Sequence, residues 1–138
     1  DNQQGQLGDG STEARLSPVA VVGLEGGVQQ IDAGKYATCA VMAAGGVRCW
    51  GWLQATFDTF DDFSVQPVPV GGLNGDVQAV ATGGGHVCAL ATSDATPGSS
   101  IQCWGFNVNG QLGVNPGWAP LEVTALLPRA LFAPVVRQ

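Results

Sequence analysis

The chain has 138 residues and a formal net charge of −6, from five basic and eleven acidic side chains. The basic residues lie far apart, which argues against nucleic acid or an anionic membrane surface as a partner, because phosphate binding requires clustered Lys and Arg. No apolar run approaches the ~20 residues that cross a bilayer, so no transmembrane segment is expected. The 21 glycines and 8 prolines follow no collagen-like period and predict short strands joined by tight turns.

The expected elements are β-strands throughout. Apolar runs bounded by Gly or Pro predict strands at 20–22, 28–33, 38–42 and 46–50. Pairing Cys39 with Cys49 sets Val41 opposite Val47 and leaves a three-residue hairpin loop. Gly45 then takes the third loop position, where a left-handed residue forms a bulge. The nearest candidate for an amphipathic helix, 122–131, is interrupted by a proline.

These runs belong to an internal repeat. Three segments recur with an offset of 49 residues: 16–24 at 65–73, 27–34 at 76–83, and 38–41 at 87–90. After an insertion in the second copy, two more recur: 47–51 at 101–105, and 2–8 at 107–113. Repeats of 40–50 residues with about four strands each are typical of β-propeller blades.

The repeated motif also resembles a known family. The string Cys-Trp-Gly-x-Asn-x-x-Gly-Gln-Leu-Gly at 103–113 resembles the regulator-of-chromosome-condensation (RCC1) repeat, as do residues 9–24 and 33–41. The version with paired cysteines resembles bacterial extracellular members. The resemblance covers residues 1 to 113 and fades after Pro116. It implies a circular propeller, typically of seven blades.

The repeat defines how the chain is organised. We expect an all-β, partial β-propeller of four-stranded blades, with units at about 1–23 (partial), 24–72 and 73–124, and a divergent tail at 125–138. Seven blades of ~50 residues would need ~350, so the chain is interpreted as a fragment of a seven-bladed propeller. Asp1 takes the position of Phe106, within a motif, which fits that interpretation. A partial propeller that assembles from several chains is the alternative.

The four cysteines occupy matching positions in two repeats, as Cys39/Cys49 and Cys88/Cys103. Residues facing each other across antiparallel strands lie at a distance that a disulfide can bridge. Two hairpin disulfides, and therefore an oxidising compartment, are the expectation. Free buried thiols are the first alternative. Spacings of ten and fifteen fit a zinc site poorly.

Other candidate chemistry is weak. His86, the single histidine, has no Ser or Cys and carboxylate at catalytic spacing, so a structural role is expected. The glycines at 83–85 are followed by a strand rather than a helix, unlike a phosphate loop. The acidic cluster at Asp58, Asp61 and Asp62 lacks the Gly turn and distal Glu of a calcium loop, and whether it binds a cation stays open. We expect no catalytic residue, cofactor or metal.

The segment 52–63 departs most from the repeat. Where other copies have a polar, Gly-rich turn, it carries four aromatic residues: Trp52, Phe57, Phe60 and Phe63. Divergent loops are common binding sites, and aromatic residues are enriched at interfaces. This loop is therefore the candidate partner-binding site. The alternative is that its aromatic residues pack over the edge of a blade.

The sequence thus predicts a non-catalytic module that binds another protein, of unknown identity, through blade loops, outside the cell or in the cell envelope (periplasm or cell surface) of a bacterium. Two alternatives stay open. One is a structural subunit of a larger envelope or extracellular assembly. The other is a proteinaceous inhibitor of a secreted enzyme, because some propellers that resemble this family inhibit β-lactamases.

Overall fold

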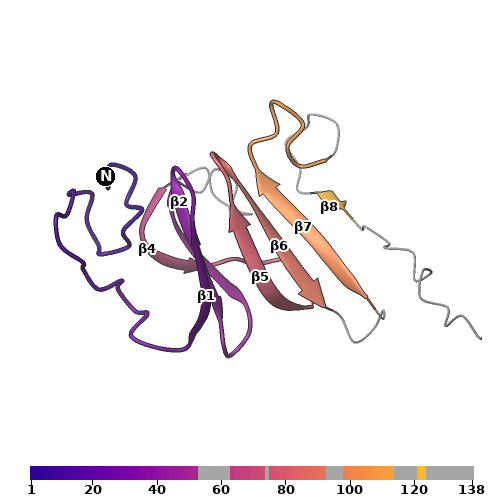
Figure 1. Ribbon diagram of the computed structural model, residues 1–138, viewed down its shortest axis with the longest axis horizontal. Coiled ribbons are helices and arrows are strands. Elements are labelled where there is room, and N and C mark those ends of the chain that lie inside the picture. Colours follow the sequence, from indigo (N-terminus) through magenta and orange to yellow (C-terminus); the bar gives the residue numbers. More distant parts are fainter. Residues whose placement is uncertain (53–62, 74, 93–97, 114–120, 124–138) are drawn as a thin grey trace, which may run out of the picture.

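The computed structural model describes residues 1–52, 63–73, 75–92, 98–113 and 121–123, which form two four-stranded antiparallel sheets (Figure 1). Each sheet is a meander whose strands pair in chain order. The first sheet contains β1 (Val28–Ala33), β2 (Ala37–Met42), β3 (Val47–Trp52) and β4 (Phe63–Pro69). The second contains β5 (Asp76–Thr82), β6 (His86–Thr92), β7 (Ser99–Gly105) and β8 (Leu121–Val123). We call the two sheets the first and second blade.

The hairpin between β2 and β3 has the predicted register. Cys39 pairs with Cys49, and Val41 pairs with Val47. Gly45 has a φ of +89° and donates its N–H to the Met42 carbonyl at 2.9 Å. A residue without a Cβ is needed there because side chains disfavour this left-handed backbone.

The strand predicted at 20–22 is wrong, because these residues form no strand. The positions equivalent to β4, one repeat earlier, are residues 14–20. Whereas β4 pairs with β3 of its own blade, no described strand precedes residues 14–20 to pair with them. Residues 20–22 are held instead by contacts within the N-terminal segment, such as the hydrogen bond from the Val22 N–H to the Gly8 carbonyl at 2.9 Å.

The last strands of the two blades occupy equivalent positions. Leu121 in β8 pairs with Cys103, just as Val68 in β4 pairs with Cys49. The segments around both strands share a pattern of Pro followed by alternating apolar residues, Pro67-Val68-Pro69-Val70 and Pro120-Leu121-Glu122-Val123. The second blade thus has its fourth strand inside the unit expected at 73–124.

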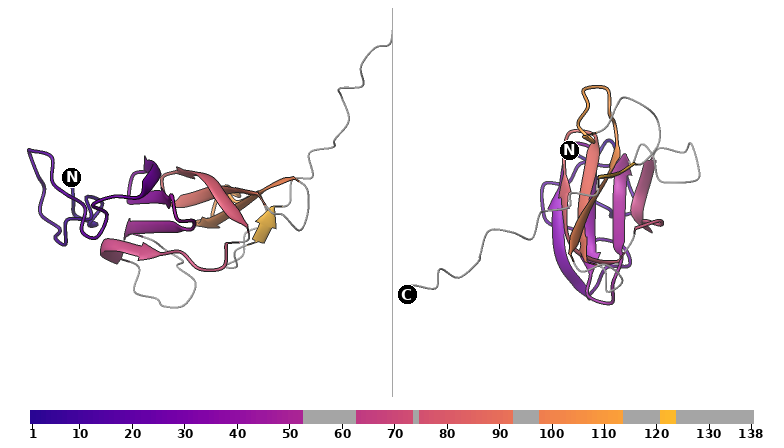
Figure 2. Two further views of the ribbon diagram at one scale, coloured as in Figure 1. Left: turned by 90° about the horizontal axis from the view of Figure 1, so that it is seen from below. Right: turned by 90° about the vertical axis from the view of Figure 1, so that its right-hand side faces the viewer.

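The core lies between the two blades, which sit side by side with β1 and β2 next to β5 (Figures 1 and 2). One face of β2 and β3 packs on the inward face of β5, β6 and β7. The buried residues of this interface are Ala37, Cys39, Val41, Val47, Cys49, Val77, Val80, Val87, Ala89, Ala91 and Trp104. The alternation of buried and exposed residues along β6 follows from the period of a strand with one covered face.

Each blade also has an open face, at positions whose counterparts are buried in the other blade. Leu90 is 38% exposed, whereas its first-blade equivalent Val41 is 0% exposed. Ile31 is 55% exposed, whereas its second-blade equivalent Val80 is 4% exposed. Val28 and Ile101 are likewise exposed, whereas their equivalents Val77 and Val47 are buried. The described part of the chain therefore contains one complete contact between two blades. On its outer side, each blade exposes a face of the kind that is buried in that contact.

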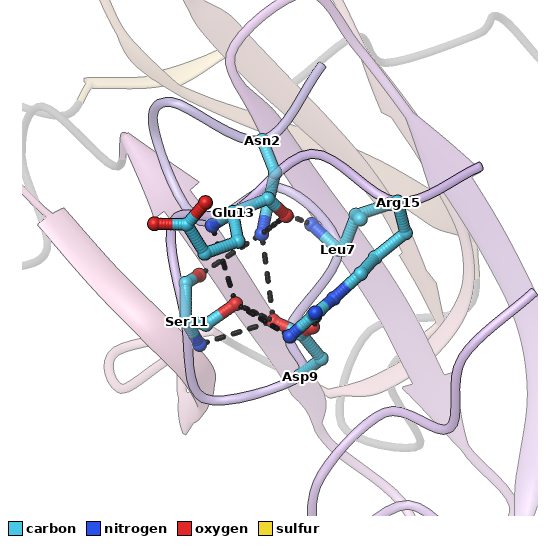
Figure 3. Close-up of polar contacts among 6 residues, drawn as sticks. All are labelled: Asn2, Leu7, Asp9, Ser11, Glu13 and Arg15. Atoms are coloured by element: carbon cyan, nitrogen blue, oxygen red, sulfur yellow. Dashed lines mark hydrogen bonds and ion pairs between the residues drawn. The ribbon is translucent and has the colours of Figure 1, made fainter. Parts of the chain in front are cut away.

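The N-terminal segment is organised around Asn2, which is fully buried (Figure 3). Its Oδ1 accepts the Leu7 N–H at 2.8 Å, and its Nδ2 donates to the carbonyls of Ser11 and Glu13, each at 3.0 Å. Asp9 supports this arrangement by accepting from the Ser11 N–H and hydroxyl and from Arg15 Nε. Side-chain groups thus satisfy the backbone of a segment without regular secondary structure.

Candidate functional site: an aromatic row on the blade rim

A row of three aromatic side chains crosses from the first blade to the second at one end of the strands. Tyr36 lies in the turn between β1 and β2, Trp52 ends β3, and Phe106 follows β7. The ring centroids of Tyr36 and Trp52 are 5.3 Å apart, and those of Trp52 and Phe106 are 5.1 Å apart, both edge to face. All three residues are half-buried. We call them the aromatic row.

A cation extends the row at its first-blade end. Lys35 Nζ lies 4.8 Å from the centroid of the Tyr36 ring, within the range of a cation–π contact. Lys35 itself is exposed. The row therefore offers both apolar surface and one positive charge to solvent.

Backbone bonds and glycines hold the row in place. Trp52 N–H donates to the Tyr36 carbonyl and Phe106 N–H to the Gly85 carbonyl, each at 2.8 Å. Gly85 occupies the position equivalent to Tyr36, and a Cβ there would lie 2.5 Å from the Phe106 ring. The second blade therefore has no aromatic side chain at this position, and the Phe106 ring occupies the space beside Gly85.

Beneath the row, Trp52 and His86 help to line a small pocket between the blades. Its volume of about 10 Å³ corresponds to a single water molecule. His86 opens β6 and packs over Gly83, where a Cβ would come within 2.3 Å of the imidazole ring. This pocket is too small to hold a substrate.

The predicted site residues are distributed as follows. Trp52 belongs to the aromatic row, and the backbone of Phe63 pairs with that of Trp52 at the start of β4. Phe57, Phe60 and the acidic residues Asp58, Asp61 and Asp62 lie outside the described residues, as do Pro116 and the tail at 125–138. In the part of the chain that the structure describes, no group of three or more His, Cys, Asp or Glu side chains could hold a metal ion.

Sequence reasoning missed Tyr36 and Phe106. Phe106 could have been found, because it directly follows the second Cys-Trp-Gly string just as Trp52 follows the first. Tyr36 has no such signal, since its equivalent Gly85 is not aromatic.

Both cysteine pairs form disulfides, Cys39–Cys49 and Cys88–Cys103, with Cα atoms 4.1 Å apart in each. Cys39 and Cys49 are fully buried between the blades. Cys88 and Cys103 lie at the equivalent positions on the open face of the second blade. Among the described residues, no helix has the length and apolarity to cross a membrane.

Adjacent four-stranded antiparallel meanders with repeated Trp positions define a β-propeller repeat module. A family model confirms the repeat type, since the model of the Regulator of chromosome condensation (RCC1) repeat matches residues 1–41. The chain is thus a partial propeller, and residues 1–41 of it match this repeat. Its sequence has no significant match among curated proteins.

Solved structures with the same fold include the crystal structure of human WBSCR16, at a TM-score of 0.63 and 27% identity over 76% of this chain. Prp20p from Saccharomyces cerevisiae matches at a TM-score of 0.64 and 18% identity over 91% of this chain. Yeast RCC1 (Prp20) bound to Kap60 matches at 0.63 and 17% over 91%. The chain spans 27%, 33% and 32% of the length of these three chains.

Proposed function

We propose that the chain is a non-catalytic propeller module that binds another protein through the aromatic row. The observation that carries this proposal is the continuous row Tyr36–Trp52–Phe106, half-exposed on the rim and flanked by the Lys35 cation. Tyr and Trp are the residue types that most often dominate the energy of a protein interface. The row also adjoins the divergent segment 53–62, which replaces a polar turn with apolar and acidic residues.

Related propellers support a protein partner. The work on Prp20p concerns its binding to Gsp1p and histones, and yeast RCC1 was solved with Kap60 bound. The present chain has a net charge of −6 and few basic residues. We therefore propose a partner other than nucleic acid, whose contact surface is apolar and carries basic groups opposite the acidic segment.

We further propose that the module works outside the cell or in the cell envelope of a bacterium. All four cysteines are paired, and disulfides persist in oxidising compartments. A role as the inhibitor of a secreted enzyme is a narrower form of the same proposal, with a hydrolase as the partner.

Site-specific photo-crosslinking tests the proposed surface. A benzophenone amino acid at position 106 samples the rim with the aromatic row, and one at position 44 samples the hairpin at the opposite end of the strands. Cells that produce the protein are irradiated, and the crosslinked products are identified by mass. One partner should be captured from position 106 and not from position 44. Equal products from both positions would contradict the proposal.

The purified partner then allows a matched comparison of binding. Trp52→Ser should weaken binding by about thirtyfold or more, because truncating an interface hot spot costs about 2 kcal/mol or more. Leu16→Ser removes an equally apolar, fully exposed side chain outside the row and should leave binding unchanged. Replacing Phe57, Phe60 and Phe63 together by Ser should also weaken binding while the fold stays intact. Unchanged binding of the triple variant would remove the divergent segment from the interface.

A second function, as a structural subunit of a larger assembly, is favoured by the open blade faces. Val28 and Ile31 on one side, and Leu90 and Ile101 on the other, expose apolar surface at positions that are buried where blades meet. In this case the isolated chain should aggregate, whereas further blades should keep it in solution. An isolated chain that stays monomeric at high concentration would count against this function.

A further inference from the structure

The aromatic row carries open hydrogen-bond donors as well as apolar surface. Among the described residues, neither Trp52 Nε1 nor the Tyr36 hydroxyl has a hydrogen-bond partner. By contrast, Trp50 Nε1 donates to the Gln6 carbonyl at 2.8 Å. In the same part of the chain, no buried side-chain nitrogen or oxygen lacks a partner, so both donors of the row reach solvent. A ligand on the row therefore meets two donors beside the rings.

The backbone N–H groups at the row are already used. Trp52 N–H donates to the Tyr36 carbonyl and Phe106 N–H to the Gly85 carbonyl, each at 2.8 Å. A partner strand that adds to a sheet edge binds through free backbone groups, so it finds no N–H at these two positions. A partner helix fits poorly as well, because its carbonyls accept bonds within the helix and cannot pair with the two side-chain donors.

A polyproline II (PPII) segment has the properties that a strand and a helix lack. It forms no internal hydrogen bonds, so its carbonyls are free to accept from Trp52 Nε1 and the Tyr36 hydroxyl. Its proline rings pack on aromatic side chains, and its fixed φ lowers the entropy lost on binding. The centroid separations of 5.3 and 5.1 Å limit the row to about 10 Å, close to the ~9 Å of one three-residue PPII turn. One such turn therefore covers the row.

Lys35 gives the site a direction. Its Nζ lies 4.8 Å from the centroid of the Tyr36 ring at the first-blade end of the row, and its side chain is exposed. An acidic residue next to the prolines would pair with Lys35 and fix which end of the segment lies on the first blade. The row itself is formed wholly by residues of the two described blades, at the ends of their strands.

We propose that the aromatic row binds a proline-containing segment of the partner protein in the PPII conformation, with an acidic residue of that segment beside Lys35. The Trp52 indole donates to a backbone carbonyl of the segment, and the proline rings pack on the rings of Tyr36, Trp52 and Phe106. The inference rests on the proposed function and deepens it, because it names what the same surface recognises. It also explains why the row combines ring surface, side-chain donors and a cation.

NMR with a defined peptide tests this proposal without the partner. The probe is a decaproline peptide that begins with two Asp residues, and proton–nitrogen correlation spectra follow the indole N–H of each Trp. Trp52→Phe identifies the Trp52 signal by its loss. We expect the peptide to move this signal downfield in a saturable way, because the indole gains an acceptor. The Trp50 signal should stay in place, since its N–H already binds the Gln6 carbonyl.

Conservative variants separate the donors from the rings, with affinity read from the backbone amide signals of the two blades. Trp52→Phe and Tyr36→Phe each keep an aromatic ring and remove one donor. Each should weaken peptide binding about two- to tenfold, the range of a single hydrogen bond. Leu16→Ser, outside the row, should bind the peptide as the wild type does. Two Lys residues in place of the two Asp of the peptide should lower its affinity about two- to fivefold, and Lys35→Glu should reverse that preference.

Two further peptides represent the other occupants of this surface. One is a flexible glycine–serine peptide and the other is an alanine-rich helical peptide, each of the same length and charge. A Trp52 signal that the proline peptide leaves in place, or that either control moves equally, would overturn the proposal. So would a crosslinked partner that the proline peptide fails to displace. These outcomes leave the proposed function standing, because capture from position 106 and the Trp52→Ser comparison test the aromatic interface by themselves.

Discussion

The side chain of Gln30 binds the backbone of Val80 on the neighbouring blade through both of its polar atoms. Nε2 donates to the Val80 carbonyl at 2.9 Å, and Oε1 accepts the Val80 N–H at 2.8 Å. The free edge of β5 is thus paired with a side-chain amide in place of another strand. This arrangement satisfies backbone groups that an edge strand would leave open to other chains.

Removing the Gln30 amide should destabilise the fold. We expect Gln30→Ala to lower the free energy of unfolding by about 1–3 kcal/mol, because two hydrogen bonds are lost and the polar groups of Val80 lose their partner. Gln29→Ala is the matched control, since Gln29 is exposed and its loss should cost less than about 0.5 kcal/mol. Urea unfolding measures both variants, and equal effects would contradict the role of Gln30.

Asp32 makes this contact between blades dependent on pH. Its carboxylate accepts hydrogen bonds from the Thr82 hydroxyl and N–H, each at 2.5 Å, and these bonds lower the pKa of Asp32 below its usual value. A pKa that is lower in the folded state means that the ionised group stabilises the fold above pH ~4. This stabilisation is lost as the pH falls through the folded-state pKa.

Chemical denaturation across a range of pH tests the role of Asp32. The wild type should lose stability as the pH falls below about 4. Asp32→Asn should be less stable than the wild type at pH 7 and should show a smaller loss on acidification. Thr82→Val, which removes the hydroxyl donor, should move the pKa of Asp32 back toward its usual value. An Asp32→Asn variant with the wild-type pH profile would show that the contact contributes nothing.

Local regularities made much of the blade predictable from sequence. The register of Cys39 with Cys49 followed from the period of two in a strand and from the position of Gly45 in the hairpin. The strand expected at 20–22 failed because a strand needs a neighbour, and apolar alternation alone does not supply one. β8 was missed because its Pro-containing pattern is short and lies 53 residues after that of β4.

The candidate site was less predictable, because it depends on contacts between blades. Divergence from the repeat identified Trp52, but the row needs Tyr36 and Phe106, which come from two different blades. The contact of Gln30 with Val80 likewise joins residues 50 positions apart, and neither residue is unusual for a strand. Only the packing of one blade on the next brings these groups together.

The N-terminal segment should contain a strongly acidic carboxyl group. Hydrogen bonds from the Ser11 hydroxyl, and then from Arg15, lower the pKa of Asp9 to about 2. In an NMR titration, the carboxyl carbon of Asp9 should shift with a midpoint near 2. Ser11→Ala removes the larger cause, so the midpoint should rise further in this variant than in Arg15→Ala. A midpoint in the ordinary range in the wild type would show that the network in Figure 3 does not form in solution.

The two disulfides should differ in how readily they are reduced. Cys39 and Cys49 are 0% exposed between the blades, whereas in the other pair Cys103 is 8% exposed and Cys88 is half-buried. Thiol–disulfide exchange requires a thiolate to reach a sulfur atom, so access controls its rate. We therefore expect Cys88–Cys103 to be reduced first under native conditions, and Cys39–Cys49 only when the blades separate.

Partial reduction followed by alkylation and peptide mass analysis would measure this order. Natively purified protein should first show all four cysteines protected from alkylation. Brief treatment with dithiothreitol should then label Cys88 and Cys103, and added urea should be needed to label Cys39 and Cys49. Gln30→Ala, which loosens the contact between the blades, should speed the reduction of Cys39–Cys49 and leave that of Cys88–Cys103 unchanged. Simultaneous reduction of both pairs in the wild type would mean that the blades do not pack stably on each other.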